Sequence, residues 1–292
     1  MFAFLNKNRT QRQHQQLLGW LKKATRITDP LKLTDLLLSA WSFADKAKVL
    51  FSLPLDAINN KTGMRLLESQ LEELGHIQLA QVVRWCSFCN EPKKTRDHGL
   101  EWAEYVVKSD IMMRWIVQRE IYLQEETRAM QKSLALQEVA DEKTKTRLEE
   151  YEAELKRLND VYWEMSNCVY MLEADIPDGV LKRAFESCRA DPEWYLCQWL
   201  RQDCARRGGC CGRGCGCCEK ARTANRQWNR GHCTGMCGCC IRTQGRKDIN
   251  AAQCELEELS SFRIAYEMTQ YSARVNRAYI WGLSFMDELD LL

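Results

Sequence analysis

The spacing of apolar residues along the chain predicts helices almost throughout. Apolar side chains recur three and four positions apart in residues 28–41 and 63–86, which is the spacing of helices with one buried stripe. No run of residues has the alternation expected of a strand. Only five prolines punctuate the chain. These patterns predict an all-α fold, a helical bundle with an N-terminal helical region over residues 1–98.

A long segment, residues 99–176, carries a coiled-coil-like repeat. Between Gly99 and Pro177 the chain has neither glycine nor proline, so no residue forces a helix to stop there. Apolar residues alternate three and four apart in its second half, and the same register continues upstream. The seam positions are Ile116, Leu123, Met130, Leu134, Leu148, Tyr151, Leu155, Leu158, Tyr162, Met165, Val169 and Leu172.

The seam becomes polar at residues 141–147, so the segment is either one long helix or a helical hairpin. The pattern also leaves open whether the seam closes an intramolecular core or a homodimeric coiled coil. A helical pair is expected over residues 177–205, with Asp191 and Pro192 as the cap and first turn of its second helix. A C-terminal helix is expected within residues 248–292.

Composition and charge limit the classes of function. The 292 residues are 45% hydrophobic, as in a folded chain, and the net charge of +2 argues against a uniformly basic nucleic-acid coat. No apolar run of roughly 18 residues predicts a membrane span. No secretory signal is recognisable, so we expect an intracellular protein of the cytoplasm or nucleus. The basic first 28 residues leave a mitochondrial transit peptide as the alternative to an ordinary first helix.

The chain's distinctive chemistry lies in residues 206–247, a cysteine-rich module. The pattern C-x3-C-x-C-C occurs twice, as CGRGCGCC and CTGMCGCC, with each cysteine matched 22 positions later. In a reducing compartment clustered cysteines indicate metal binding first, and four thiolates satisfy a tetrahedral Zn²⁺. The matched cysteines are Cys211, Cys215, Cys217, Cys218, Cys233, Cys237, Cys239 and Cys240.

The number and pairing of the zinc sites stay open. Two ions, one for each copy, are the simplest expectation, but ligands can be shared crosswise and adjacent cysteines can serve different ions. Cys204, Cys210 and His232 extend the ligand set and allow a third site with shared thiolates. We favour a structural cluster over a metal store, because a store has no need for Trp228 and a basic linker.

Two other uses of the module compete with this interpretation. Clustered cysteines beside basic residues resemble S-acylated membrane anchors, although Gly and Arg surround them here. Residues 201–247 hold eleven Lys or Arg against two acidic residues, which favours either nucleic-acid binding or compensation of thiolate charge. The candidate nucleic-acid contacts are Arg222, Arg226, Trp228 and Arg230.

Evidence for catalysis is absent from the sequence. No phosphate-binding, dinucleotide-binding or nucleophile motif occurs, and the four histidines are scattered, so we expect no enzyme. Cys86, Cys89 and His98 have the residue types of another zinc site, but packing at a helix end is the preferred interpretation.

The block DPEWYLCQWLRQDCARRGGCCGRGCGCCEK, followed by GHCTGMCGCC, resembles a cysteine-rich block of uncharacterised proteins from filamentous fungi. This resemblance implies no activity, substrate or partner. The sequence as a whole predicts a non-enzymatic, zinc-stabilised interaction or scaffold protein. Its partners are expected to be proteins or a second copy, bound through residues 99–176, with a membrane involved only if the chain is acylated.

Overall fold

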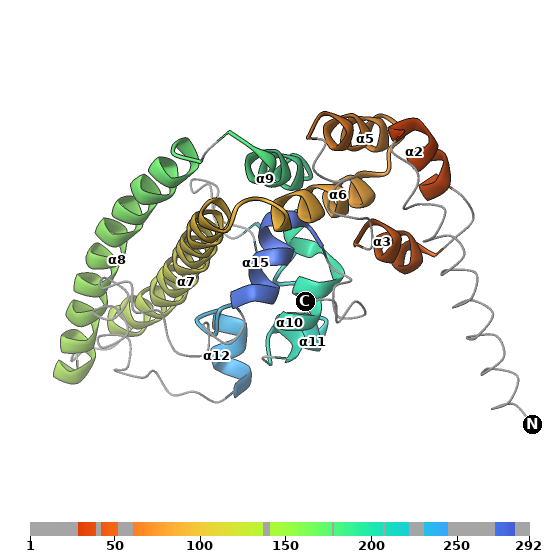
Figure 1. The fold of residues 1–292 in the computed structure, drawn as a ribbon. Coiled ribbons are helices and arrows are strands. Elements are labelled where there is room, and N and C mark those ends of the chain that lie inside the picture. The colour runs from red at the N-terminus through yellow and green to blue at the C-terminus, as the bar shows by residue number, and fades with distance from the viewer. Residues whose placement is uncertain are drawn as a thin grey trace, which may run out of the picture. The chain divides into compact units, whose positions relative to one another are not determined.

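A computed structural model describes residues 29–38, 42–51, 61–136, 141–176, 178–206, 208–221, 231–244 and 272–283. These residues form helices and turns, with no strand among them, which confirms the all-α expectation (Figure 1). The longest helix, α7, spans Lys93–Ala135. Within this part of the chain, no helix combines the length and apolarity needed to cross a lipid bilayer. The chain divides into two compact units.

The first unit contains residues 1–100, 177–191 and 280–292. Its central helix is α6, which packs against α3, α5 and α9. Because helices cover α6 on several sides, most of its side chains from Leu79 to Phe88 are buried, including polar ones. The helices of this unit are α2 (Pro30–Leu38), α3 (Phe43–Phe51), α5 (Lys61–Glu73), α6 (Ile77–Cys89) and α9 (Val180–Ala190).

The apolar run over residues 63–86 forms two helices, α5 and α6, because the chain turns at Gly75. Gly75 has a φ of 78°, a left-handed conformation that glycine adopts without steric cost. Its N–H bonds the Glu72 carbonyl at 2.9 Å, and the His76 N–H bonds the Leu71 carbonyl at 2.7 Å. This is the Schellman pattern of a helix C-terminus.

A buried ion network joins three helices of the first unit. The Glu68 carboxylate on α5 accepts hydrogen bonds from Arg84 on α6 at 2.7 Å and from Arg183 on α9 at 2.9 and 3.1 Å. Aromatic packing adds to this core, with the Trp281 ring centroid 5.1 Å from the centroids of both Trp85 and Phe88. The polar and apolar contacts together fix α5, α6 and α9 around one core.

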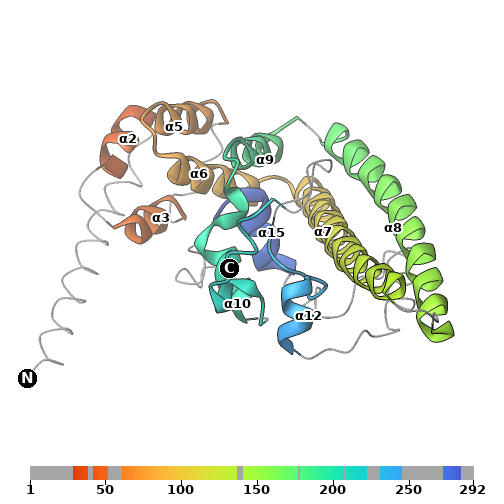
Figure 2. The same cartoon turned by 180° about the vertical axis from the view of Figure 1, so that it is seen from behind.

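The second unit contains residues 101–176 and 192–279. Helix α8 (Glu142–Ala174) lies along α7 and runs antiparallel to it (Figures 1 and 2). Trp102 near the start of the unit's part of α7 donates to the Leu172 carbonyl near the end of α8 at 2.6 Å. Arg119 binds Glu154 at 2.8 and 2.9 Å between these points. The two helices are therefore a hairpin rather than one continuous helix.

The predicted seam closes an apolar core inside this unit. Ile116 and Leu123 on α7 are fully buried in one cluster with the seam of α8. The buried seam residues of α8 are Tyr151, Leu158, Tyr162, Met165 and Val169. Of the two alternatives for this seam, the intramolecular core is the one that the chain forms.

The remainder of the second unit is a series of short helices. They are the 3-10 turn η1 (Trp194–Leu196), α10 (Gln198–Arg206), α11 (Cys210–Arg213), α12 (Gly238–Gln244) and α15 (Ser272–Trp281), whose last residues belong to the first unit. The expected helix that begins at Asp191 is broken, because Cys197 is extended, with φ −55° and ψ 150°, between η1 and α10. Asp191 instead follows the last residue of α9. The first 28 residues and residues 245–271 lie outside the described residues.

Candidate metal centre

The ten cysteines between residues 204 and 240 gather in one sulfur-rich core of the second unit. They come from α10, α11, the following loop, the segment 231–237 and the start of α12. Six are buried, and the other four are partly buried against them. His232, also buried, lies in the same cluster, so all eleven ligands proposed from the sequence meet.

The sulfur spacing matches coordination geometry. Five S···S distances lie between 3.5 and 3.9 Å: Cys204–Cys218, Cys204–Cys233, Cys210–Cys237, Cys210–Cys240 and Cys215–Cys239. A tetrahedron of four sulfurs bonded to Zn²⁺ at about 2.3 Å has edges of about 3.8 Å. A disulfide would need about 2.05 Å, and all fifteen described cysteines are free thiols. The cluster therefore has the dimensions of thiolates around ions.

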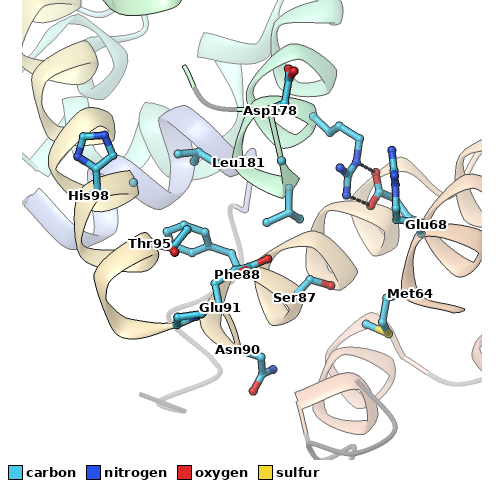
Figure 3. Close-up of a pocket in the computed structure, with 16 residues that line it drawn as sticks. Met64, Glu68, Ser87, Phe88, Asn90, Glu91, Thr95, His98, Asp178 and Leu181 are labelled. Carbon is cyan, nitrogen blue, oxygen red and sulfur yellow. Dashed lines mark hydrogen bonds and ion pairs between the residues drawn. The ribbon is translucent and has the colours of Figure 1, made fainter. Parts of the chain in front are cut away.

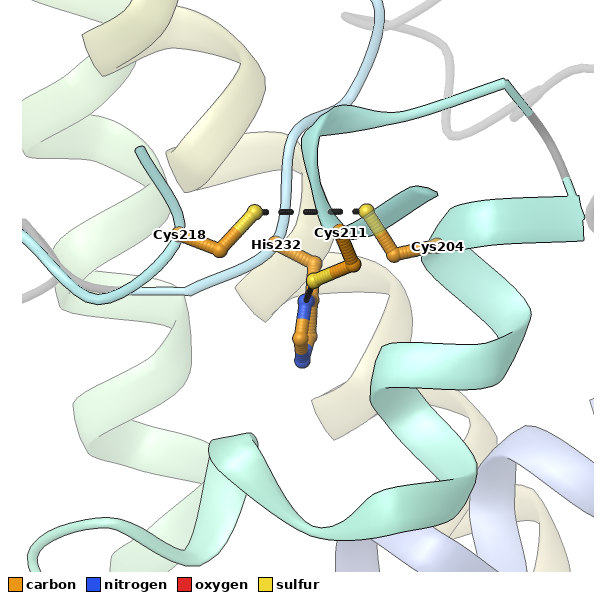
Figure 4. Close-up of side chains that lie close together, drawn as sticks. All are labelled: Cys204, Cys211, Cys218 and His232. Carbon is orange, nitrogen blue, oxygen red and sulfur yellow. Dashed lines mark hydrogen bonds between the residues drawn. The ribbon is translucent and has the colours of Figure 1, made fainter. Parts of the chain in front are cut away.

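One group offers four ligands, the number that a tetrahedral ion needs (Figure 4). The ligand atoms of Cys204, Cys211, Cys218 and His232 all lie within 4.8 Å of one another. Cys211 Sγ is 3.3 Å from His232 Nδ1, and Cys204 Sγ is 3.9 Å from Cys218 Sγ. Three thiolates and one imidazole are a common ligand set of structural zinc.

The hydrogen bonding of His232 prepares its Nδ1 for a metal. Its Nε2 contacts the backbone carbonyl of Tyr195. Since a carbonyl only accepts, Nε2 carries the proton and donates it, which leaves a lone pair on Nδ1 facing Cys211. The break at Cys197 explains why Tyr195 is able to accept, because it places this carbonyl at a junction between η1 and α10.

Helix α7 holds the segment that carries His232, a role that sequence reasoning missed. Gln118 donates to the His232 carbonyl at 3.1 Å and accepts from the Thr234 N–H at 2.9 Å. Arg114 packs so closely against Gly231 that a Cβ there would lie 2.5 Å from Arg114 Cδ. The available signal in the sequence was a polar residue, Gln118, on the buried face of α7. The sequence does not show which distant group this residue contacts.

The remaining ligands form two groups that share one thiol. Cys210, Cys215, Cys217 and Cys239 form the first, and Cys210, Cys233 and Cys240 form the second. Cys237 lies beside both, with its Sγ 3.9 Å from Cys210 Sγ. Neither copy of the repeat forms a group by itself, so crosswise sharing is the arrangement found.

No protein-family model, no curated protein and no solved structure matches this chain. The comparisons therefore name no function. The geometry of the cluster carries the functional argument alone.

The thiols of the cluster need a cation in order to ionise together. Burial is the first cause that raises the pKa of Cys211 and of Cys217 to about 11, and it also raises the pKa of Cys210 far above the ordinary range. Two thiols shift the other way. Hydrogen bonds with Cys218 and Cys233 lower the pKa of Cys204 far below its ordinary range, and the backbone N–H of Cys217 lowers the pKa of Cys215 to about 7. Most of these sulfurs therefore keep their protons near neutral pH unless a metal ion displaces them.

Part of the module's basic charge is used within the chain. Arg213 donates to Cys240 Sγ at 2.8 Å and to Cys210 Sγ at 3.4 Å. Arg201 pairs with Glu219 at 2.8 Å, and Arg242 pairs with Glu125 at 3.1 Å. The proposed nucleic-acid contacts Arg222, Arg226, Trp228 and Arg230 lie outside the described residues.

The other cysteine motif does not assemble a ligand set. In the described ranges, every group of three or more close candidate ligands belongs to the cluster above, so Cys86, Cys89 and His98 form none. Cys86 is buried in α6, as packing at a helix end predicts. His98 instead lines a cavity of about 570 Å³ in the first unit, together with Glu68 and Asp178 (Figure 3).

Proposed function

We propose that residues 204–240 bind zinc and that the protein is a non-enzymatic, zinc-stabilised interaction or scaffold protein. The observation that carries this proposal is that the ligand atoms of four residues lie within 4.8 Å of one another: Cys204, Cys211, Cys218 and His232. Sulfur and imidazole nitrogen are the ligands that Zn²⁺ selects, and the contact of His232 Nε2 with the Tyr195 carbonyl leaves Nδ1 as the ring nitrogen that faces the group.

A structural role suits this group better than a catalytic one. Four protein ligands fill a tetrahedral ion, whereas catalytic zinc keeps one position for water or substrate. Cys204, Cys218 and His232 are each at most 2% exposed, so substrate has little access to the ion. The module has few apolar side chains besides its cysteines, and metal bonds would supply the folding free energy that an apolar core supplies elsewhere.

The test is metal analysis of the full chain purified under reducing conditions. Native mass spectrometry is expected to find zinc bound, and removing zinc with a chelator is expected to reduce helicity by circular dichroism. Cys204→Ser should bind less zinc, whereas Cys188→Ser, which changes another buried thiol in the first unit, should keep all of it. A protein that folds without metal, or equal zinc in both variants, would refute the proposal.

The interaction role is supported by an exposed apolar patch on α8. Trp163, Tyr170 and Met171 are 55%, 72% and 56% exposed, while the seam of the same helix is buried. We expect a partner or a second copy to bind residues 99–176 through this patch. Sedimentation velocity should show that Trp163→Lys loses self-association. Leu136→Lys, at an exposed residue directly after α7, should retain it. A monomer at all concentrations would leave a different protein as the partner to be sought by crosslinking at α8.

The two competing uses of the module receive less support. Six of the ten sulfurs are buried, which counts against S-acylation, because a lipid chain needs an exposed thiol. Arg201, Arg213 and Arg242 already have acceptors within the chain, which lowers the positive charge free for phosphate. Hydroxylamine-sensitive labelling in cells tests acylation, and salt-dependent binding of an oligonucleotide tests the nucleic-acid role.

A further inference from the structure

The repeated unit of the module is one residue longer than the eight-residue pattern C-x3-C-x-C-C. Cys210 directly precedes the first copy, and His232 directly precedes the second, again 22 positions apart. The repeat is therefore a nine-residue unit with five ligands, led by Cys210 in one copy and by His232 in the other.

The structure uses equivalent positions of the two copies in equivalent ways. The outer cysteines of the first copy, Cys211 and Cys218, group with His232, which leads the second copy. The outer cysteines of the second copy, Cys233 and Cys240, group with Cys210, which leads the first. Each copy thus lends its leading residue to the other, and two reciprocal centres result.

The inner cysteines of the repeat form a third centre. Cys215 and Cys217 from the first copy lie within 4.8 Å of Cys239 from the second, and Cys210 completes this group. Cys237, the fourth inner cysteine, is 3.9 Å from Cys210 and is the remaining donor for the centre of Cys233 and Cys240.

The number of donors fits three ions with one bridge. Three tetrahedral ions require twelve bonds, and the cluster offers eleven donor atoms. Cys210 belongs to two groups, and a thiolate has enough lone pairs to bind two ions. We propose, on the basis of the zinc binding proposed above, that the module holds three Zn²⁺: one ion at His232 and a pair that shares Cys210. The first ion adjoins the pair, because Cys204 Sγ lies 3.5 Å from Cys233 Sγ, but no thiol belongs to both groups.

The position of Arg213 agrees with this division. The ion at His232 would have three thiolates, a net charge of −1, whereas seven thiolates on the paired ions leave a net charge of −3. Arg213 donates to Cys210 and Cys240, which are both ligands of the pair. The Arg213 guanidinium therefore lies at the centre with the larger negative charge. Its hydrogen bonds to thiolate stabilise that centre more than they would stabilise the ion at His232.

The test is ¹¹³Cd NMR and native mass spectrometry of the full chain, labelled with ¹⁵N and loaded with ¹¹³Cd²⁺ as its one metal. We expect three ions and three resonances. Two of these should show mutual ¹¹³Cd–¹¹³Cd coupling through the shared sulfur, and the third should couple to an imidazole nitrogen. Two ions, or three without mutual coupling, would overturn the bridged arrangement but leave metal binding intact. No bound metal would overturn both proposals.

Two matched variants separate the centres. Cys204→Ser is expected to lose one ion and keep the coupled pair. Cys210→Ser is expected to lose the coupling and at least one ion, and to keep the resonance coupled to nitrogen. Coupling that persists in Cys210→Ser would assign the bridge to another sulfur and refute the role of Cys210. The result with the unchanged chain decides the number of ions even if a variant fails to fold.

Discussion

Replacing Gly209 with alanine is expected to disrupt the metal centre through steric contact alone. Gly209 has φ −80° and ψ 180°, a conformation that alanine adopts without strain. The added Cβ, however, would lie 2.5 Å from Cys204 Sγ and 2.6 Å from Cys233 Sγ. Ordinary contact distances are about 3.5–4.0 Å, so both sulfurs would have to retreat by about 1 Å.

The size of the effect follows from the narrow tolerance of metal bonds. Zn–S distances vary by only about 0.2 Å, so Cys204 and Cys233 would lose their positions around their ions if they retreated that far. Overpacking of a tight core costs about 1–3 kcal/mol. At about 1.4 kcal/mol for each factor of ten, zinc affinity should fall roughly 5- to 150-fold.

The assay is competition for zinc with a chromophoric chelator, under reducing conditions. Gly212→Ala is the control, because its Cβ would lie 3.3 Å from Ala205, beside no sulfur, on the exposed side of α11. It should bind zinc as the unchanged chain does. If Gly209→Ala also bound the same number of ions with affinity within twofold, the sulfurs would not be packed as described.

Two further predictions concern buried polar groups. Burial raises the pKa of Glu68, but hydrogen bonds from Arg183 and Arg84 lower it by a larger amount. The pKa of Glu68 therefore lies below its ordinary value of 4.5. The stability that the ionised Glu68 gives to the first unit should therefore be complete above about pH 5 and lost as the pH falls below 4.5. Glu68→Gln should lower the free energy of unfolding in urea at pH 7 by about 3–5 kcal/mol. An unchanged urea midpoint would contradict this. Gln118→Leu should lower the free energy of unfolding by about 1–3 kcal/mol, because the buried carbonyl of His232 loses a donor. Competition with a chelator should then show weaker zinc binding. Zinc affinity equal to that of the unchanged chain would mean that α7 does not position His232.

The helices could be predicted from the sequence because their signals are local. The seam of α8, from Tyr151 to Val169, is a repeat that any helix of that register buries on one face. The break at Cys197 could not be predicted, since Asp191 and Pro192 are good signals for a helix start. The break coincides with a contact between residues far apart in the sequence: the Tyr195 carbonyl accepts a hydrogen bond from His232, 37 positions away.

The ligand residues could also be predicted, but their pairing could not, and the reason lies in the adjacent donors. Cys210 and Cys211, like Cys239 and Cys240, are neighbours in helices, where successive side chains point about 100° apart and so reach different centres. Sequence spacing suggests instead that near neighbours share an ion.

This divergence links the two copies of the repeat. Because adjacent ligands separate, each copy contributes to more than one group, and no group is complete without a residue from outside its own copy. Half of the module should therefore hold no complete site. Folding of residues 204–240 is then expected to need both copies, because either copy alone leaves every group short of ligands, even though a single ligand substitution removes only its own ion.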